Sequence, residues 1–86
     1  MSFHLINLAW HRDLRATQKI VLIALADFAQ QTTGECNPSV RVLSAKCGLS
    51  ASAVRKQIKA LQAARLVDVI SREGGVAYRV LLGALA

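Results

Sequence analysis

Residues 43–66 read LSAKCGLSASAVRKQIKALQAARL, and this stretch decides the fold of the chain. At its centre is a short break, Cys47-Gly48-Leu49-Ser50. Gly48 can adopt the left-handed backbone that ends a helix, and Ser50 is a preferred N-cap for the next one. Apolar residues recur at three- and four-residue spacing on both sides of the break: Val40, Leu43 and Cys47 before it, and Val54, Ile58 and Leu61 after it. The stretch therefore predicts two helices, each with one apolar stripe, joined by a very short turn.

The second of these helices carries its polar side chains opposite its apolar stripe. At about 100° per residue, four of them lie roughly 100° to 200° from Val54: Ser52, Arg55, Lys56 and Lys59. A closely joined helix pair whose second helix is basic on its free face is the helix-turn-helix arrangement, in which that helix enters the major groove of DNA. The alternative is a solvated surface helix that happens to be basic.

The charge distribution favours the DNA interpretation. The chain has 11 Lys and Arg against 5 Asp and Glu, a formal net charge of +6. Residues 36–67 hold six of the cations and no acid, so the rest of the chain holds five of each sign. A solvated helix usually mixes Glu with Lys, and a localised excess of cations indicates a polyanionic partner.

Length and composition predict a single small domain. With 86 residues, 53% of them hydrophobic, the chain has enough apolar residues for one core. The longest apolar run, residues 20–26, is too short to span a bilayer, and no secretory leader is recognised, so we expect a cytoplasmic protein. The spacing of Cys36 and Cys47 permits a disulfide, but reduced, buried thiols are the expected state in that compartment.

The N-terminal part is expected to be an arm followed by a helix. Residues 1–15 contain large apolar residues at irregular spacing, compatible with a short strand, an irregular arm or a first helical turn. His4 and His11 have no Cys or acid at ligand spacing, so no metal site is expected. Residues 17–30 have helical periodicity with a wide apolar surface and Thr17 as a possible cap. We expect this to be the central helix of the domain, with a dimer contact as the alternative.

A polar loop and a hairpin flank the helix pair. Residues 31–39 form the loop, in which Ser39 is the expected N-cap of the first helix of the pair. That helix start, helped by Arg41, could contact a phosphate. Residues 66–82 alternate in polarity around the turn residues Glu73-Gly74-Gly75, which predicts a β-hairpin. Arg72 near its tip could reach a minor groove or a phosphate, or be simply an exposed arginine.

These residues resemble the winged helix-turn-helix domains of bacterial, phage and plasmid regulators and replication initiators. The resemblance covers about three quarters of the chain and rests on the patterns just described together with four short segments: residues 18–22, 25–27, 36–39 and 66–67. It implies a mainly α fold with a small β-hairpin, an α+β domain of three helices and a C-terminal wing over residues 16–82. An arm (1–15) and a tail (83–86) would flank it.

The resemblance also implies which residues contact DNA. The helix over residues 50–64 would lie in the major groove, and four residues would lie nearest the bases: Ser50, Ala51, Ser52 and Arg55. Arg55 is the best candidate for base reading, because a guanidinium can bind guanine O6 and N7 together. Lys56 and Lys59 would contact phosphates, and four further residues would complete the grip on the backbone: Ser39, Arg41, Lys46 and Arg72.

Two positions depart from the family pattern. Ser44 replaces a usual Ala in the first helix of the pair, and Arg65 replaces a usual Gly before the wing. A left-handed Arg65 would cost roughly 1 kcal/mol, so either the helix ends differently or Arg65 is retained for a phosphate contact.

The expected function is that of a sequence-specific, double-stranded DNA-binding regulator, with the DNA-binding domain of a replication initiator as the alternative. A winged helix that docks an acidic protein is the second alternative. A module this small tends to need a second copy for tight binding, so we expect a homodimer, with the Trp10 arm and the tail residues Leu81, Leu82 and Leu85 as candidate surfaces. No paired carboxylates, activated nucleophile or metal cluster occurs at usable spacing, so neither an enzyme nor a cofactor, small-molecule ligand or membrane contact is expected.

Overall fold

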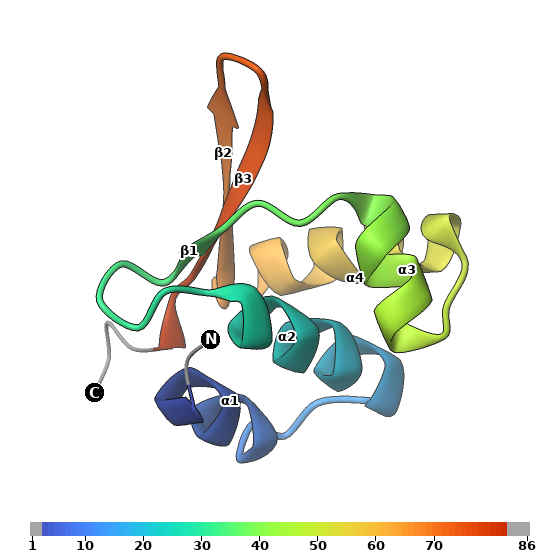
Figure 1. Cartoon of the computed structure of the whole chain (residues 1–86). Helices are drawn as coiled ribbons and strands as arrows, with labels where there is room; N and C mark the ends of the chain where they lie inside the picture. Colours follow the sequence, from blue (N-terminus) through green and yellow to red (C-terminus); the bar gives the residue numbers. More distant parts are fainter. Residues whose placement is uncertain (1–2, 83–86) are drawn as a thin grey trace.

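The computed structural model describes residues 3–82 as a helical layer from which a β-hairpin projects (Figure 1). The elements follow in the order α1 (Phe3–Trp10), α2 (Ala16–Phe28), β1 (Glu35–Cys36), α3 (Val40–Cys47), α4 (Ala51–Ala63), β2 (Val67–Arg72) and β3 (Gly75–Val80). The predicted mainly α fold with a C-terminal hairpin is confirmed. Among the helices of residues 3–82, none is long and apolar enough to cross a membrane.

The helix pair forms as its capping residues predict. The Ser39 hydroxyl accepts a hydrogen bond from the backbone N–H of Val42, and the Ser50 hydroxyl accepts one from that of Ala53, both at 3.1 Å. Gly48 closes α3 with a φ of 68°, in the left-handed region where glycine is favoured. The turn is also closed by the Ser44 hydroxyl, which donates to the Leu49 carbonyl. Serine at position 44 therefore stabilises the turn.

The central position of α2 is also confirmed. This helix contacts α1, α3, α4 and both β1 and β3, and five of its residues are buried: Val21, Leu22, Ala24, Leu25 and Ala26. The prediction that Thr17 caps it is wrong. The helix begins one residue earlier, at Ala16, with Arg15 at the N-cap and no side-chain cap, because the backbone N–H of Lys19 already bonds to the Arg15 carbonyl at 2.8 Å.

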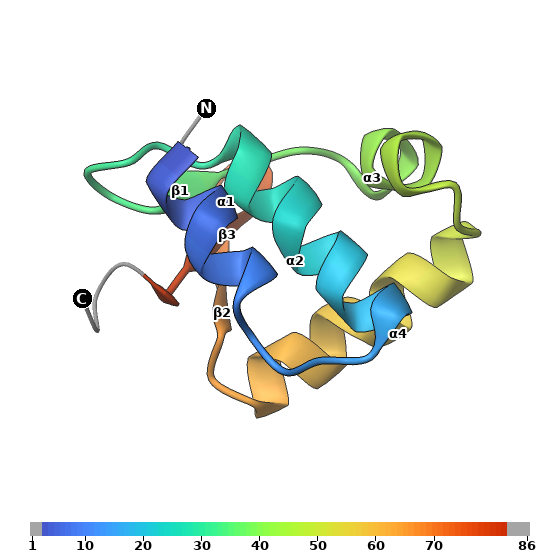
Figure 2. The same ribbon diagram turned by 90° about the horizontal axis from the view of Figure 1, so that it is seen from below.

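The N-terminal segment, expected to be an arm, contains a fourth helix, α1. Figure 2 shows it lying against α2. Leu5 and Ala9, one turn apart, are buried in the core and are 1% and 0% exposed. Burial of two residues on one face stabilises a helix whose own pattern is irregular. Trp10, at its end, is 57% exposed.

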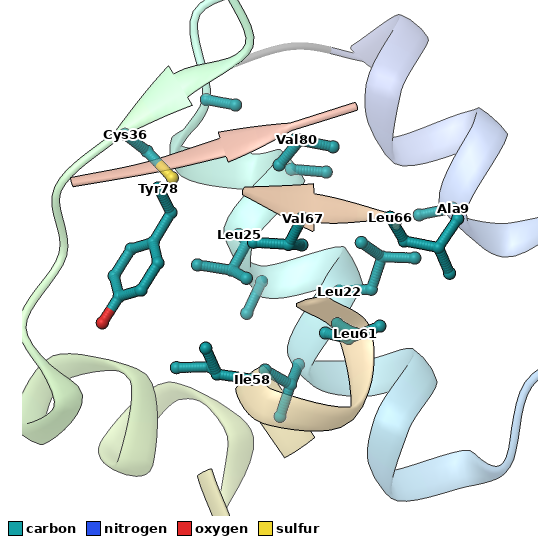
Figure 3. Close-up of a cluster of buried hydrophobic side chains, with 14 of the residues drawn as sticks. Ala9, Leu22, Leu25, Cys36, Ile58, Leu61, Leu66, Val67, Tyr78 and Val80 are labelled. Carbon is teal, nitrogen blue, oxygen red and sulfur yellow. The ribbon is translucent and has the colours of Figure 1, made fainter. Parts of the chain in front are cut away.

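The hairpin is part of a three-stranded antiparallel sheet of order β1-β3-β2. Its register pairs Val67 with Val80 and Arg72 with Gly75. The short strand β1 lies within the predicted polar loop and was not foreseen; it pairs Glu35 with Arg79 and Cys36 with Tyr78. The core fills the space between this sheet, α2 and α4, where Leu25, Ile58 and Val67 point toward one another (Figure 3).

The junction between α4 and β2 shows how the helix ends at Arg65, where the family usually has glycine. Arg65 has a φ of 61°, the sole positive value outside glycine among the described residues. The N–H groups of Arg65 and Leu66 bond to the carbonyls of Gln62 and Leu61, each at 3.0 Å, which is the Schellman pattern of helix termination. The helix therefore ends as it would with glycine, and Arg65 carries the strain.

Candidate nucleic-acid interface

The outer face of α4 carries three exposed cations. Val54, Ile58 and Leu61 turn inward and are at most 7% exposed. The predicted polar residues all face solvent: Ser52, Arg55, Lys56 and Lys59. Among the ion pairs found within residues 3–82, none involves these three cations. The face is thus exposed, basic and without an intramolecular counterion.

The start of α3 lies beside the sheet, at the end of the loop that follows β1. Arg41, in the first turn, is exposed. The Ser39 and Ser50 oxygens are used as acceptors by their own helices, so each hydroxyl orders a helix start whose free backbone N–H groups point outward. Ala51, half-buried, follows the Ser50 cap.

Lys46, expected to be a phosphate contact, already has an intramolecular partner. Its Nζ lies 2.7 Å from Oδ2 of Asp27 on α2 and 5.1 Å from the centre of the Phe28 ring. The pair joins the end of α3 to α2. A phosphate would have to compete with Asp27 for this cation.

Arg72 is similarly engaged at the end of β2. Its Nη2 donates to Oε1 of Glu35 on β1, and Nη2 of Arg79 lies 3.8 Å from the other oxygen of the same carboxylate. Glu35 thus draws both arginines of the wing toward the base of the sheet. The wing therefore offers less free positive charge than its arginines alone indicate.

A cleft of about 660 Å³ separates the wing from the start of α3. Polar residues dominate its walls, among them Glu35, Asn37, Ser39 and Arg72, and Tyr78 of β3 also lines it. In the sequence, Tyr78 is one residue of the alternating stretch 66–82 that predicts the hairpin. The signal that was missed is β1: without that strand, nothing in the sequence places the loop of residues 37–39 beside Tyr78.

Burial perturbs three titratable groups near this cleft and the α2–α3 contact. It raises the pKa of the Cys36 thiol to about 11 and also raises the pKa of Cys47, where Lys46 opposes the effect. The pKa of Tyr78 is raised by burial and by Cys36, against the opposing charge of Arg55. Both cysteines are free thiols; Cys36 is buried, whereas Cys47 is half-buried. The raised values keep them protonated and unreactive at neutral pH. Within the part of the chain described, no three potential metal ligands cluster.

Comparison with known proteins gives one match. A family model described as a helix-turn-helix domain matches residues 12–67, from just before α2 to the first residue of β2. No curated protein and no solved structure matches the chain. The matched range contains α2, α3 and α4 together with all the free cations of the α4 face.

Proposed function

The chain belongs to the helix-turn-helix domain family, which implies DNA binding, and we propose that it is a sequence-specific transcriptional regulator acting on double-stranded DNA. One observation supports this most directly. The α4 face presents Arg55, Lys56 and Lys59 to solvent without an ion-pair partner among the described residues. Leaving three exposed cations on one helix face unpaired suits a surface whose counterion is a polyanion.

In the proposed complex, α4 lies in the major groove with its N-terminal end foremost. Ser50, Ala51 and Ser52 then lie nearest the bases, and Arg55, one turn further, binds a guanine edge with two hydrogen bonds. Lys56 and Lys59 contact the phosphates on either side. They contribute affinity without reading sequence.

The rest of the grip comes from the start of α3 and from the wing. Ser39 and Arg41 offer helix-start N–H groups and an exposed guanidinium to the backbone. Lys46 and Arg72 contribute only if a phosphate displaces Asp27 or Glu35, respectively. We therefore rank these two below the α4 lysines as DNA contacts.

We also propose that two copies bind a two-fold site. Trp10 is 57% exposed at the edge of an apolar hollow of about 370 Å³, whose other walls include Ala16, Ile20 and Ile23. A second copy of the chain would cover this surface and place two α4 helices on successive half-sites. Of the three tail residues predicted to form a dimer surface, Leu82 is 4% exposed and packs in the core, Leu81 is half-buried, and Leu85 lies outside the described residues.

The experiment is selection of bound fragments from mixed genomic DNA over a salt series. We expect wild type to enrich a palindromic site and Arg55→Ala to lose preference at one base of each half-site, by roughly 5- to 150-fold. Lys59→Ala should weaken all sequences equally and reduce the slope of log K against log salt by about 0.9 per chain.

A neutral truncation on the same helix provides the matched control. Gln62→Ala removes an exposed, uncharged side chain of α4 and should change neither the slope nor the preference. Retention of no DNA at moderate salt would contradict the proposal and favour a protein-interaction module that docks an acidic partner. A dimer that persists in Trp10→Ala would contradict the proposed dimer surface alone.

A further inference from the structure

Tyr78 is a buried aromatic residue whose polar end faces the cleft. It pairs with Val69 on one side and Cys36 on the other, and the residue is only 7% exposed. Figure 3 shows the ring directed away from the sheet, with its hydroxyl pointing toward the helical segments and not into the cluster of Leu25 and Val67. Packing fixes the ring, so the position of its hydroxyl is fixed as well.

The hydroxyl is available for an external partner. None of the hydrogen bonds found within residues 3–82 uses it, and no fully buried polar side-chain atom there lacks a partner. The oxygen must therefore be in contact with solvent, in the cleft that Tyr78 lines. The packed ring therefore holds an unpaired hydroxyl in a fixed position in an open cleft, where it can bind a partner from outside the fold.

The surroundings favour an anionic acceptor. The charge of Arg55 on α4 is close enough to act on the phenol, and the cleft walls carry Arg72 and the capped start of α3 at Ser39. The pKa of Tyr78 is raised overall, so the hydroxyl keeps its proton at neutral pH and can donate. Two acids line the cleft with Arg72: Glu35, which is itself paired with two arginines, and Glu73, the neighbour of Arg72 at the turn of the wing.

We propose that the Tyr78 hydroxyl donates a hydrogen bond to a backbone phosphate of the DNA strand that passes between α4 and the wing, next to Arg55. This deepens the proposed function and rests on it. A phosphate fits better than a base edge, because the buried ring cannot extend into the groove whereas a phosphodiester can enter the mouth of the cleft. Tyr78 would then fix the register in which Arg55 meets its base.

The test begins with Tyr78→Phe, which removes one oxygen and keeps the packed ring. On the selected site we expect about tenfold weaker binding, because a hydrogen bond to a charged acceptor is lost. The salt slope of binding should not change, because no charge is removed. The midpoint of urea unfolding should stay at the wild-type value. Ser71→Ala is the matched control: it removes an exposed hydroxyl of the same wing that does not line the cleft, and it should bind as wild type.

A scan of single neutral methylphosphonates through the site identifies the acceptor. One substitution should weaken wild type by up to about tenfold more than it weakens Tyr78→Phe, because the hydrogen bond lost in that variant is worth about tenfold. All other positions should affect the two proteins equally. Wild-type binding by Tyr78→Phe, or weakened binding without such a position, overturns the inference while leaving the proposed function intact. Failure of wild type itself to bind DNA overturns both.

Discussion

Replacing Arg65 with glycine should stabilise the domain. A non-glycine residue in the left-handed region costs about 1 to 2 kcal/mol, and Arg65 has a φ of 61°. Glycine removes that cost but adds flexibility to the unfolded chain, worth about 0.5 to 1 kcal/mol in the opposite direction. Both Schellman hydrogen bonds are made by backbone groups and persist in the variant. We therefore expect a net gain of about 0.5 to 1 kcal/mol.

The assay is reversible thermal and urea unfolding followed by circular dichroism. In a domain of this size, about 1 kcal/mol corresponds to a rise in Tm of roughly 4 to 8 °C. Arg65→Ala is the control, because it removes the same charge and keeps the left-handed strain. If Arg65→Gly is no more stable than Arg65→Ala, the strain argument is refuted.

The same two variants test why an arginine occupies the position. Arg65 is exposed immediately after α4, at the junction with the wing. If it is retained for a phosphate contact, both variants should lower the salt slope of DNA binding by about 0.9, despite their different stabilities. Equal slopes for wild type and both variants would remove the phosphate explanation and leave the strain without a functional counterpart.

Three further outcomes follow from the sheet. Gly34→Ala should lower the free energy of unfolding in urea by about 2 kcal/mol or more, because the φ of Gly34 is 71° and an added Cβ would lie 2.5 Å from the Val80 carbonyl oxygen. Gly48→Ala is the control: Gly48 is also left-handed but has open space around it, so the loss should be only about 1 kcal/mol. Between about pH 9 and 11, the Cys36 thiol ionises in the unfolded chain but stays protonated in the folded one. The free energy of unfolding should therefore fall as pH rises through this range, by at most about 2 to 3 kcal/mol. In Cys36→Ala, this pH-dependent fall should be absent. Glu35→Gln should free Arg72 and Arg79, strengthening DNA binding and steepening its salt slope by about one; an unchanged slope would show that these arginines lie off the DNA path.

The helix pair and the wing could be predicted from the sequence because their signals are local. Ser39, Gly48 and Ser50 act within one turn of their own positions, and the hairpin is specified by alternation around Gly74-Gly75. The helix α1 could not be predicted with the same clarity. Its formation depends on burying Leu5 and Ala9 against α2, which is a tertiary contact.

The strand β1 was missed for a related reason. It is two residues long, too short for a period-two pattern, and exists because Gly34 can approach Val80 closely enough for a 2.7 Å backbone hydrogen bond. Everything that depends on β1 was therefore missed too: the pairing of Arg72 with Glu35, and the cleft in which the Tyr78 hydroxyl lies.

Ion pairing divides the cations of the predicted DNA site into two groups. Along the sequence, the whole net charge lies in residues 36–67, and Arg72 follows in the wing. In the folded domain, Asp27 and Glu35, both outside that segment, pair with Lys46 and Arg72. Because neither acid pairs with the α4 cations, these three cations stay free on the helix that we propose reads the sequence. In the proposed complex, this pairing would reduce nonspecific attraction of α3 and the wing to the DNA backbone, and so would favour discrimination between sites over affinity for any DNA.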